Sequence, residues 1–151
     1  MPLVHHGDRF RVMIRVMSAW RRKASTLFPT LKEELTDQDY SIYMLFFDLL
    51  PLSREAHVSE DEKVLRKIYG FSEWCLNQSS GEVSNAAGVA FYEHLLDVPD
   101  LRSKVIPWLS PNVIAIVRPL WAERLEVAEF DQLERSIRNR KTAKYRELDV
   151  E

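Results

Sequence analysis

The chain has 151 residues, of which 46% are hydrophobic and 29% charged, and its formal net charge is −2. A domain of this length buries enough surface to fold without a metal or a disulfide, and the composition excludes an intrinsically disordered chain. Cys75 is the only cysteine, which excludes an intramolecular disulfide and a cysteine-based metal site and predicts a buried thiol.

The charges are distributed unevenly along the chain. Residues 1–28 carry six basic and one acidic residue, residues 29–100 carry five basic and fourteen acidic residues, and residues 101–151 carry ten basic and eight acidic residues. The acidic middle segment argues against a general nucleic-acid-binding protein, which needs a large basic surface. It suits a basic protein partner, although a solvated acidic face without any partner would give the same pattern.

No apolar run reaches the roughly 18 residues of a membrane-spanning helix, and residues 1–28 lack the layout of a signal peptide. We therefore expect a cytoplasmic protein. Residues 1–7 are predicted to be a flexible N-terminus, residues 8–138 a single helical domain, and residues 139–151 a frayed or disordered tail.

Helix-start signals and prolines divide the chain into helices, and no segment has the alternation of a β-hairpin. Apolar residues recur with helical spacing from Asp8 to Leu27, and Pro29 ends that helix. The segment 37–50 is apolar nearly all round, which predicts a central core helix that Pro51 kinks or ends. The sequence therefore predicts an all-α fold of about six to seven helices packed as antiparallel hairpins.

Further helices follow in the second half of the chain. Ser59 and Glu62 have the spacing of a capping box, in which each side chain satisfies a backbone donor, so the next helix is predicted from Ser59 to Asn77. Ser110-Pro111 combines an N-cap residue with a proline at the first helical position. The predicted helices after residue 77 are 82–96, 99–106, 110–127 and one around 130–137.

The sequence contains no motif of a catalytic or cofactor site. His57 lies in a polar stretch and is expected to be exposed, whereas His94 lies at the border of an apolar face. Glu93-His94 lacks the second histidine of a zinc-protease helix, because position 98 is valine. No glycine-rich phosphate loop and no nucleophile elbow occur. The sequence therefore favours a protein that is not an enzyme and that uses no metal or other cofactor.

The candidate partner-binding residues are acidic, aromatic or titratable side chains. Three carboxylates follow one another at positions 60–62, where a basic partner would meet them. Trp108 lies between two prolines and is a candidate for a half-exposed anchor, although its spacing also suits a core residue. A pocket near Glu93 and His94 would instead support small-molecule binding or catalysis. The full candidate set is Glu60, Asp61, Glu62, Glu73, Tyr92, Glu93, His94 and Trp108.

Four strings occur in a fixed order in the sequence: Ile68–Leu76, Phe91–Leu95, Pro107–Pro111 and Arg118–Trp121. Together they resemble a family of small bacterial all-helical proteins classified as a domain of unknown function. The resemblance implies an immunity-protein-like character, which means neutralisation of a toxin made by the same cell, and it implies no established activity.

The sequence therefore predicts a non-enzymatic protein-binding domain, in particular a bacterial immunity protein whose partner is a basic toxin. The alternative is a small-molecule-binding or enzymatic helical domain that uses a pocket near Glu93 and His94. A third hypothesis is a nucleic-acid or membrane-surface protein that uses the basic segments 11–23 and 135–144, whose binding would fall steeply with salt.

Overall fold

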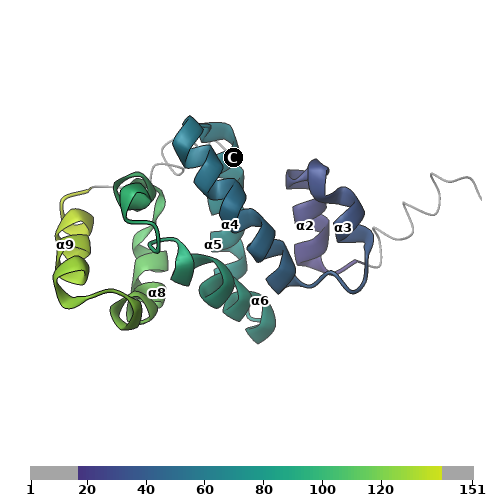
Figure 1. Cartoon of the computed structure of the whole chain (residues 1–151). Coiled ribbons are helices and arrows are strands. Elements are labelled where there is room, and N and C mark those ends of the chain that lie inside the picture. The colour runs from purple at the N-terminus through teal and green to yellow at the C-terminus, as the bar shows by residue number, and fades with distance from the viewer. Residues whose placement is uncertain (1–16, 141–151) are drawn as a thin grey trace, which may run out of the picture. The chain divides into compact units, whose positions relative to one another are not determined.

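The computed structural model describes residues 17–140 (Figure 1). These residues form helices and turns with no strand among them, which confirms the predicted all-α fold class. They fall into two compact units, one ending at Ile42 and the other beginning at Tyr43. The predicted flexible residues 1–7 and residues 141–151 of the predicted tail lie outside the described part of the chain.

The first unit contains two helices, α2 (Ala19–Leu27) and α3 (Lys32–Thr36), joined by a 3-10 turn over Pro29–Leu31. The two helices lie side by side (Figure 1). The predicted continuous helix from Asp8 to Leu27 is wrong, because Ser18 separates α2 from the residues before it, and the predicted helical residues 8–16 lie outside the described part of the chain. Ser18 has φ −58° and ψ 157°, an extended conformation that cannot belong to a helix.

A buried arginine holds the first unit together. The guanidinium of Arg21 donates to the backbone carbonyl oxygens of Leu35 and Asp37 at 2.9 Å and of Tyr40 at 2.7 Å. Burial lowers the pKa of Arg21, and the nearby charge of Asp37 opposes that shift. Arg21 belongs to the basic N-terminal segment of the sequence, yet its guanidinium is buried and donates its hydrogen bonds to backbone carbonyl groups of the same unit.

The second unit begins with a hairpin of α4 (Ile42–Ser59) and α5 (Glu62–Leu76). The next helix, α6 (Gly81–Ala86), continues into a π-helical turn over Ala87–Phe91 and a 3-10 turn over Tyr92–His94. The predicted helix 82–96 is therefore a helical run that changes its pitch twice and ends near His94.

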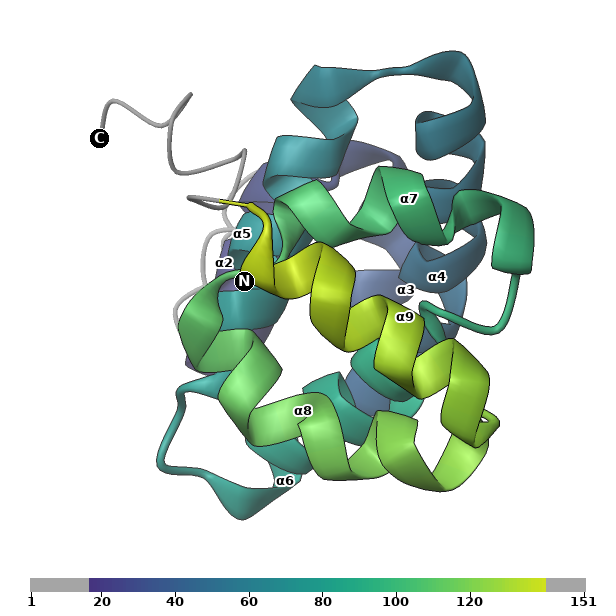
Figure 2. The same ribbon diagram turned by 90° about the vertical axis from the view of Figure 1, so that its left-hand side faces the viewer.

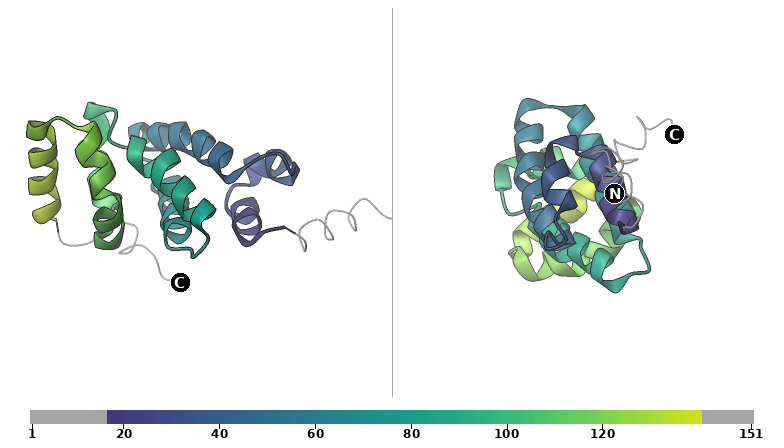
Figure 3. Two further views of the ribbon diagram at one scale, coloured as in Figure 1. Left: turned by 90° about the horizontal axis from the view of Figure 1, so that it is seen from below. Right: turned by 90° about the vertical axis from the view of Figure 1, so that its right-hand side faces the viewer.

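Three more helices complete the second unit. A short helix, α7 (Arg102–Val105), is flanked by 3-10 turns and precedes α8 (Pro111–Arg124) and α9 (Val127–Arg138). α8 and α9 form a hairpin, and α7 lies beside α9 (Figures 2 and 3). Ser110 caps α8 as predicted, because its Oγ accepts the backbone N–H of Val113 at 3.2 Å.

Pro51 does not end its helix, because α4 runs through it to Ser59. Proline cannot donate to the carbonyl oxygen four residues earlier, which belongs to Phe47. Phe47 and Pro51 are both exposed, so water can replace the missing donor. The helix therefore continues past the proline, and of the two predicted effects of Pro51 the end of the helix is wrong.

Aromatic rings form the centre of the second unit. Phe46 on α4 stacks on Phe91 with 5.7 Å between ring centroids, and it also contacts Phe71 on α5. Tyr69 stacks on Trp108 at 5.5 Å. Cys75 is fully buried beside this core, which confirms the predicted structural thiol.

Candidate functional site

Helix α4 is apolar on two opposite sides. Leu45, Phe46 and Leu49 point into the core and are fully buried. On the other side Phe47 is 58% exposed and Val58 is 68% exposed, so the predicted central position of this helix in the core is wrong. We call this side the outer face of α4, and its members are Met44, Phe47, Asp48, Pro51, Leu52, Glu55 and Val58.

The exposed apolar side chains of the described residues are concentrated on this helix. Among the described residues, six large hydrophobic side chains are exposed, and four of them lie on α4. Scattered exposed apolar residues are normal on a protein surface, whereas a contiguous group marks an interaction site. The six are Met44, Phe47, Leu52 and Val58 on α4, Ile116 on α8 and Val127 on α9.

Two carboxylates lie within the outer face of α4. Asp48 and Glu55 are both exposed. Asp48 follows Met44 by four residues and precedes Glu55 by seven, spacings that place all three on one side of a helix. The outer face of α4 is therefore both apolar and acidic.

α4 ends in a Schellman turn at Glu60. The N–H of Asp61 donates to the carbonyl oxygen of Ala56 at 2.9 Å, and the N–H of Glu60 donates to that of His57 at 3.3 Å. Glu60 has a φ of 57°, the left-handed conformation that glycine usually fills at this position. The turn therefore carries a carboxylate where a glycine would be the unstrained choice.

Asp61, and not Ser59, caps α5. The carboxylate of Asp61 accepts the N–H of Val64 at 3.2 Å. Ser59 is the last residue of α4, and its Oγ donates to the carbonyl oxygen of Glu55 at 3.0 Å. The predicted capping box of Ser59 and Glu62 is wrong, because Ser59 is still part of α4 and the N-cap position of α5 is occupied by Asp61.

A pocket of about 310 Å³ lies beside the Schellman turn. The Nζ of Lys104 lies in its lining, 3.3 Å from the carbonyl oxygen of His57 and 4.0 Å from Oε1 of Glu60. Carbonyl groups at the C-terminal end of a helix attract cations, so this end of α4 holds an ammonium group of the chain itself. The pocket is lined by His57, Glu60, Glu62, Leu65, Lys104, Pro107 and Trp108.

Two aromatic side chains of this pocket belong to the core. His57 is 2% exposed, and its Nε2 shares a hydrogen bond of 2.7 Å with the hydroxyl of Tyr69, so its predicted exposure is wrong. The polar residues around His57 in the sequence give no sign of Tyr69, which comes from α5. Trp108 is 3% exposed and is therefore a core residue and not a half-exposed anchor. Burial raises the pKa of Tyr69.

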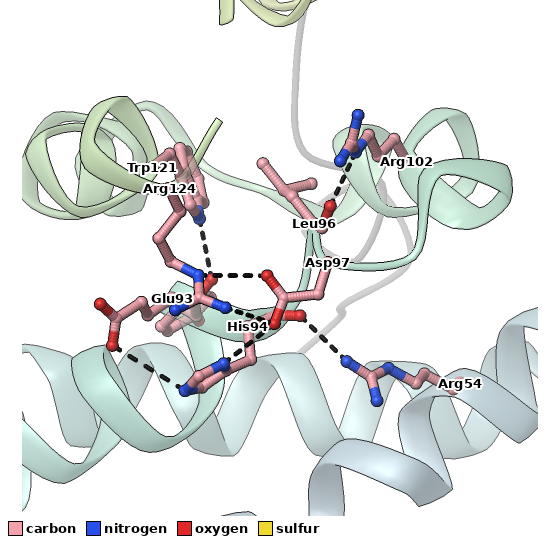
Figure 4. Close-up of polar contacts among 9 residues, drawn as sticks. Arg54, Glu93, His94, Leu96, Asp97, Arg102, Trp121 and Arg124 are labelled. Atoms are coloured by element: carbon pink, nitrogen blue, oxygen red, sulfur yellow. Dashed lines mark hydrogen bonds and ion pairs between the residues drawn. The ribbon is translucent and has the colours of Figure 1, made fainter. Parts of the chain in front are cut away.

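A second polar cluster lies after the 3-10 turn at Tyr92–His94 (Figure 4). Arg124 on α8 donates to both carboxylate oxygens of Asp97, at 3.1 and 2.8 Å, and Nδ1 of His94 lies 3.0 Å from Oδ2 of Asp97. Burial alone would raise the pKa of Asp97, but the hydrogen bonds from His94 and Arg124 outweigh it and hold the pKa below its usual value. Asp97 is therefore a negative charge held in place between the imidazole of His94 and the guanidinium of Arg124.

The same cluster fixes the backbone of this turn from three sides (Figure 4). Side-chain donors from α4, α7 and α8 each reach a carbonyl oxygen of the turn. The carbonyl oxygens of Tyr92 and His94 also accept the backbone N–H groups of Leu95 at 3.3 Å and Asp97 at 3.1 Å, so these side-chain donors add to the hydrogen bonds of the turn itself. They are Arg54 to His94 at 3.0 Å, Arg102 to Leu96 at 2.7 Å and Trp121 to Tyr92 at 2.8 Å.

The structure divides four of the candidate site residues, Glu73, Tyr92, Glu93 and His94, between the core and the surface. Glu73 is 7% exposed and accepts a hydrogen bond of 2.6 Å from Oγ of Ser110. Tyr92 is 1% exposed, and burial together with the nearby negative charge of Glu73 raises its pKa. The side chains of Glu93 and His94 are 22% and 32% exposed, so the first two residues belong to the core and the last two to the surface.

The acidic candidates Glu60 and Asp61 are exposed, and Glu62 is half-buried. Within residues 17–140, histidine, cysteine, aspartate and glutamate side chains nowhere gather in threes in a way that could hold a metal ion. No helix in the same residue range has both the length and the apolar character that crossing a membrane requires.

Residues 22–124 match the family model described as a domain of unknown function, DUF7674, and the chain belongs to that family. No curated protein and no solved structure matches the chain. The matched residues include α4, α5 and all the residues that line the pocket beside the Schellman turn. The match ends at Arg124, the last residue of α8.

Proposed function

We propose that this chain is a non-enzymatic protein-binding domain. The observation that carries the proposal is the group of four large apolar side chains exposed on the outer face of α4. Complete burial of such a side chain gains roughly 1.5–3 kcal/mol, and because the four are 36–68% exposed, folding of the described residues leaves only part of that gain to a partner. Phe47 is the expected centre of the contact, because aromatic side chains dominate the energetics of interfaces.

The finer proposal is a bacterial immunity protein that acts in the cytoplasm and neutralises a basic toxin. The acidic excess of residues 29–100 supports it, since this segment contains fourteen acidic and only five basic residues. Asp48 and Glu55 support it more specifically, because they lie within the apolar surface itself. Opposite charges on two partners speed their association and exclude wrong partners.

Capture of the partner from native cells tests the broader proposal. The full chain is used as bait in three forms, wild type, Phe47→Ala and Val127→Ala, at low and moderate salt. Val127 is 79% exposed on α9 and is the matched control for loss of an exposed apolar side chain. We expect one stoichiometric protein partner that wild type and Val127→Ala retain and Phe47→Ala loses. Equal capture by all three baits, or no partner at all, contradicts the proposal.

The captured protein then tests the finer proposal. A toxin arrests growth when it is expressed alone in bacteria, and co-expression of this chain should restore growth. Phe47→Ala should restore it less than Val127→Ala does. A captured protein that is harmless when expressed alone contradicts the immunity proposal and leaves the protein-binding proposal in place.

A further inference from the structure

We infer that the outer face of α4 docks a basic amphipathic helix of its partner. The inference rests on the proposed function and adds the chemistry of the segment that α4 binds. The exposed apolar residues run from Met44 to Val58, which is about 21 Å along the helix axis, or about four turns. At 3.6 residues per turn, Met44, Phe47 and Val58 lie within about 60° of one another around the helix, and Leu52 lies beyond the carboxylates. A strip of this length fits a second helix lying along α4, because such a helix presents apolar residues at i, i+3, i+4 and i+7.

The carboxylates of the outer face define the charge of that helix. Asp48 and Glu55 are two helical turns apart, about 10.5 Å along the axis, with Pro51 between them. Lysine or arginine residues at the same spacing on the partner would pair with both carboxylates. Their aliphatic stems would cover Phe47 and Leu52 while the charged ends stay in water. A helix that is apolar on one side and basic along its edge satisfies both sets of groups.

The same carboxylates disfavour two other occupants. If two copies of this chain paired antiparallel through α4 around Pro51, Asp48 of one copy would lie opposite Glu55 of the other. A parallel pair would place each carboxylate beside its own equivalent. Either arrangement brings like charges together in a surface that is being dehydrated, which is unfavourable. An anionic membrane surface would repel these carboxylates in the same way.

A designed peptide tests the inference without knowledge of the native partner. The probe is a fluorescent helical peptide of about 18 residues, five turns, made of leucine on one side and lysine on the other. One comparison peptide carries glutamate in place of every lysine, and another has the same composition in shuffled order. Binding to the full chain is measured by fluorescence anisotropy at low and moderate salt.

Matched variants locate the contact. We expect Phe47→Ala to weaken binding of the leucine–lysine peptide at least about tenfold, as a central interface residue does. The double variant Asp48→Asn with Glu55→Gln should weaken it about three- to tenfold at low salt and less at moderate salt. The controls are Val127→Ala on α9 for the apolar change and Asp131→Asn on the same helix for the charge change, and both should bind as wild type does.

Three outcomes would overturn the inference. They are equal binding of the lysine and glutamate peptides, equal binding of the ordered and shuffled peptides, and variants of α4 that bind no more weakly than the α9 controls. The proposed function has its own test in the capture experiment. A native partner that depends on Phe47, together with a leucine–lysine peptide that does not bind, would reject the basic helix and retain the protein-binding domain.

Discussion

Helices α4 and α5 pack against each other, yet they use their apolar residues differently. On α5 the large apolar side chains are buried or half-buried, and none of the exposed large hydrophobic residues of the described chain belongs to it. α4 buries one apolar side and exposes another. The sequence of α5 is therefore accounted for by folding, whereas that of α4 contains apolar residues that folding does not need.

Two neighbouring phenylalanines of α4 give the largest expected contrast in stability. Phe46 is fully buried, and Phe47 is 58% exposed. Phe46→Ala should lower the free energy of unfolding by about 3–5 kcal/mol, because it leaves a cavity among aromatic rings. Phe47→Ala should change it by no more than about 0.5 kcal/mol. Urea unfolding followed by circular dichroism measures both.

Phe46→Leu serves as a milder substitution if the alanine variant does not fold, and it should still be less stable than Phe47→Leu. A loss of several kcal/mol from Phe47→Ala would contradict the assignment of the outer face of α4 to binding. It would mean that Phe47 is covered by the protein itself, so that both sides of α4 serve folding as α5 does.

The buried carboxylate of α5 gives the second contrast. Glu73 is taken out of water and accepts a hydrogen bond from Ser110, whose Oγ also accepts the N–H of Val113 as the cap of α8. Ser110→Ala removes both contacts and should lower the free energy of unfolding by about 1–3 kcal/mol. The matched control is Ser59→Ala on α4, where the exposed hydroxyl only bonds within its helix, and it should have little effect. Equal losses from the two variants would contradict this account.

The sequence predicted α8 well, because its apolar spacing and the Ser110 cap agree, and apolar spacing alone placed the body of α5 and α9. It misplaced the start of α5 because Ser59 and Asp61 are both good caps, and only the extension of α4 through Pro51 decides between them. That extension depends on the exposure of Phe47 and Pro51, which local sequence does not specify. The predicted exposure of His57 is wrong for a similar reason: the residue is buried against Tyr69, which is twelve residues away on the next helix and is not part of its local sequence.

The outer face of α4 could have been found only in part from the sequence. An apolar run nearly all round a helix predicts a central core helix, and Asp48 is the one sign of solvent within the apolar part of the predicted segment. The chemistry of Glu73, Tyr92 and Trp108 suits a binding site, and on that ground the sequence predicts them as site residues. Those three are core residues, because polar and aromatic groups also build cores when their partners are present.

A glycine in the middle of α5 gives the third contrast. Gly70 lies within the helix, and a Cβ added there would meet no atom within 4 Å. Gly70→Ala should raise the free energy of unfolding by about 0.5–1 kcal/mol, because alanine loses less backbone freedom on folding. The variant is measured by urea unfolding beside wild type. A destabilised variant would mean that α5 is packed more tightly at this point than the structure indicates.

At the end of α4 a glycine is expected to be more stable than the residue present, and this gives the smallest expected effect. Glu60 holds the left-handed conformation of the Schellman turn with a side chain that is 81% exposed, and its ion pair with Lys104 spans 4.0 Å. Glu60→Gly should raise the free energy of unfolding by about 0.5 kcal/mol, since relief of the strained backbone outweighs the added freedom of the unfolded chain. Glu60→Asn, which tolerates the same conformation, is the control that removes the charge alone.

The value of Glu60 lies in what the two variants do to binding. If both bind the captured partner more weakly while Glu60→Gly is more stable than wild type, the carboxylate is retained for binding at a cost in stability. α4 would then depart from a purely structural helix at its end as well as along its outer face. If both variants bind as wild type does, the predicted role of Glu60 in partner binding is wrong, and the contact is confined to the outer face.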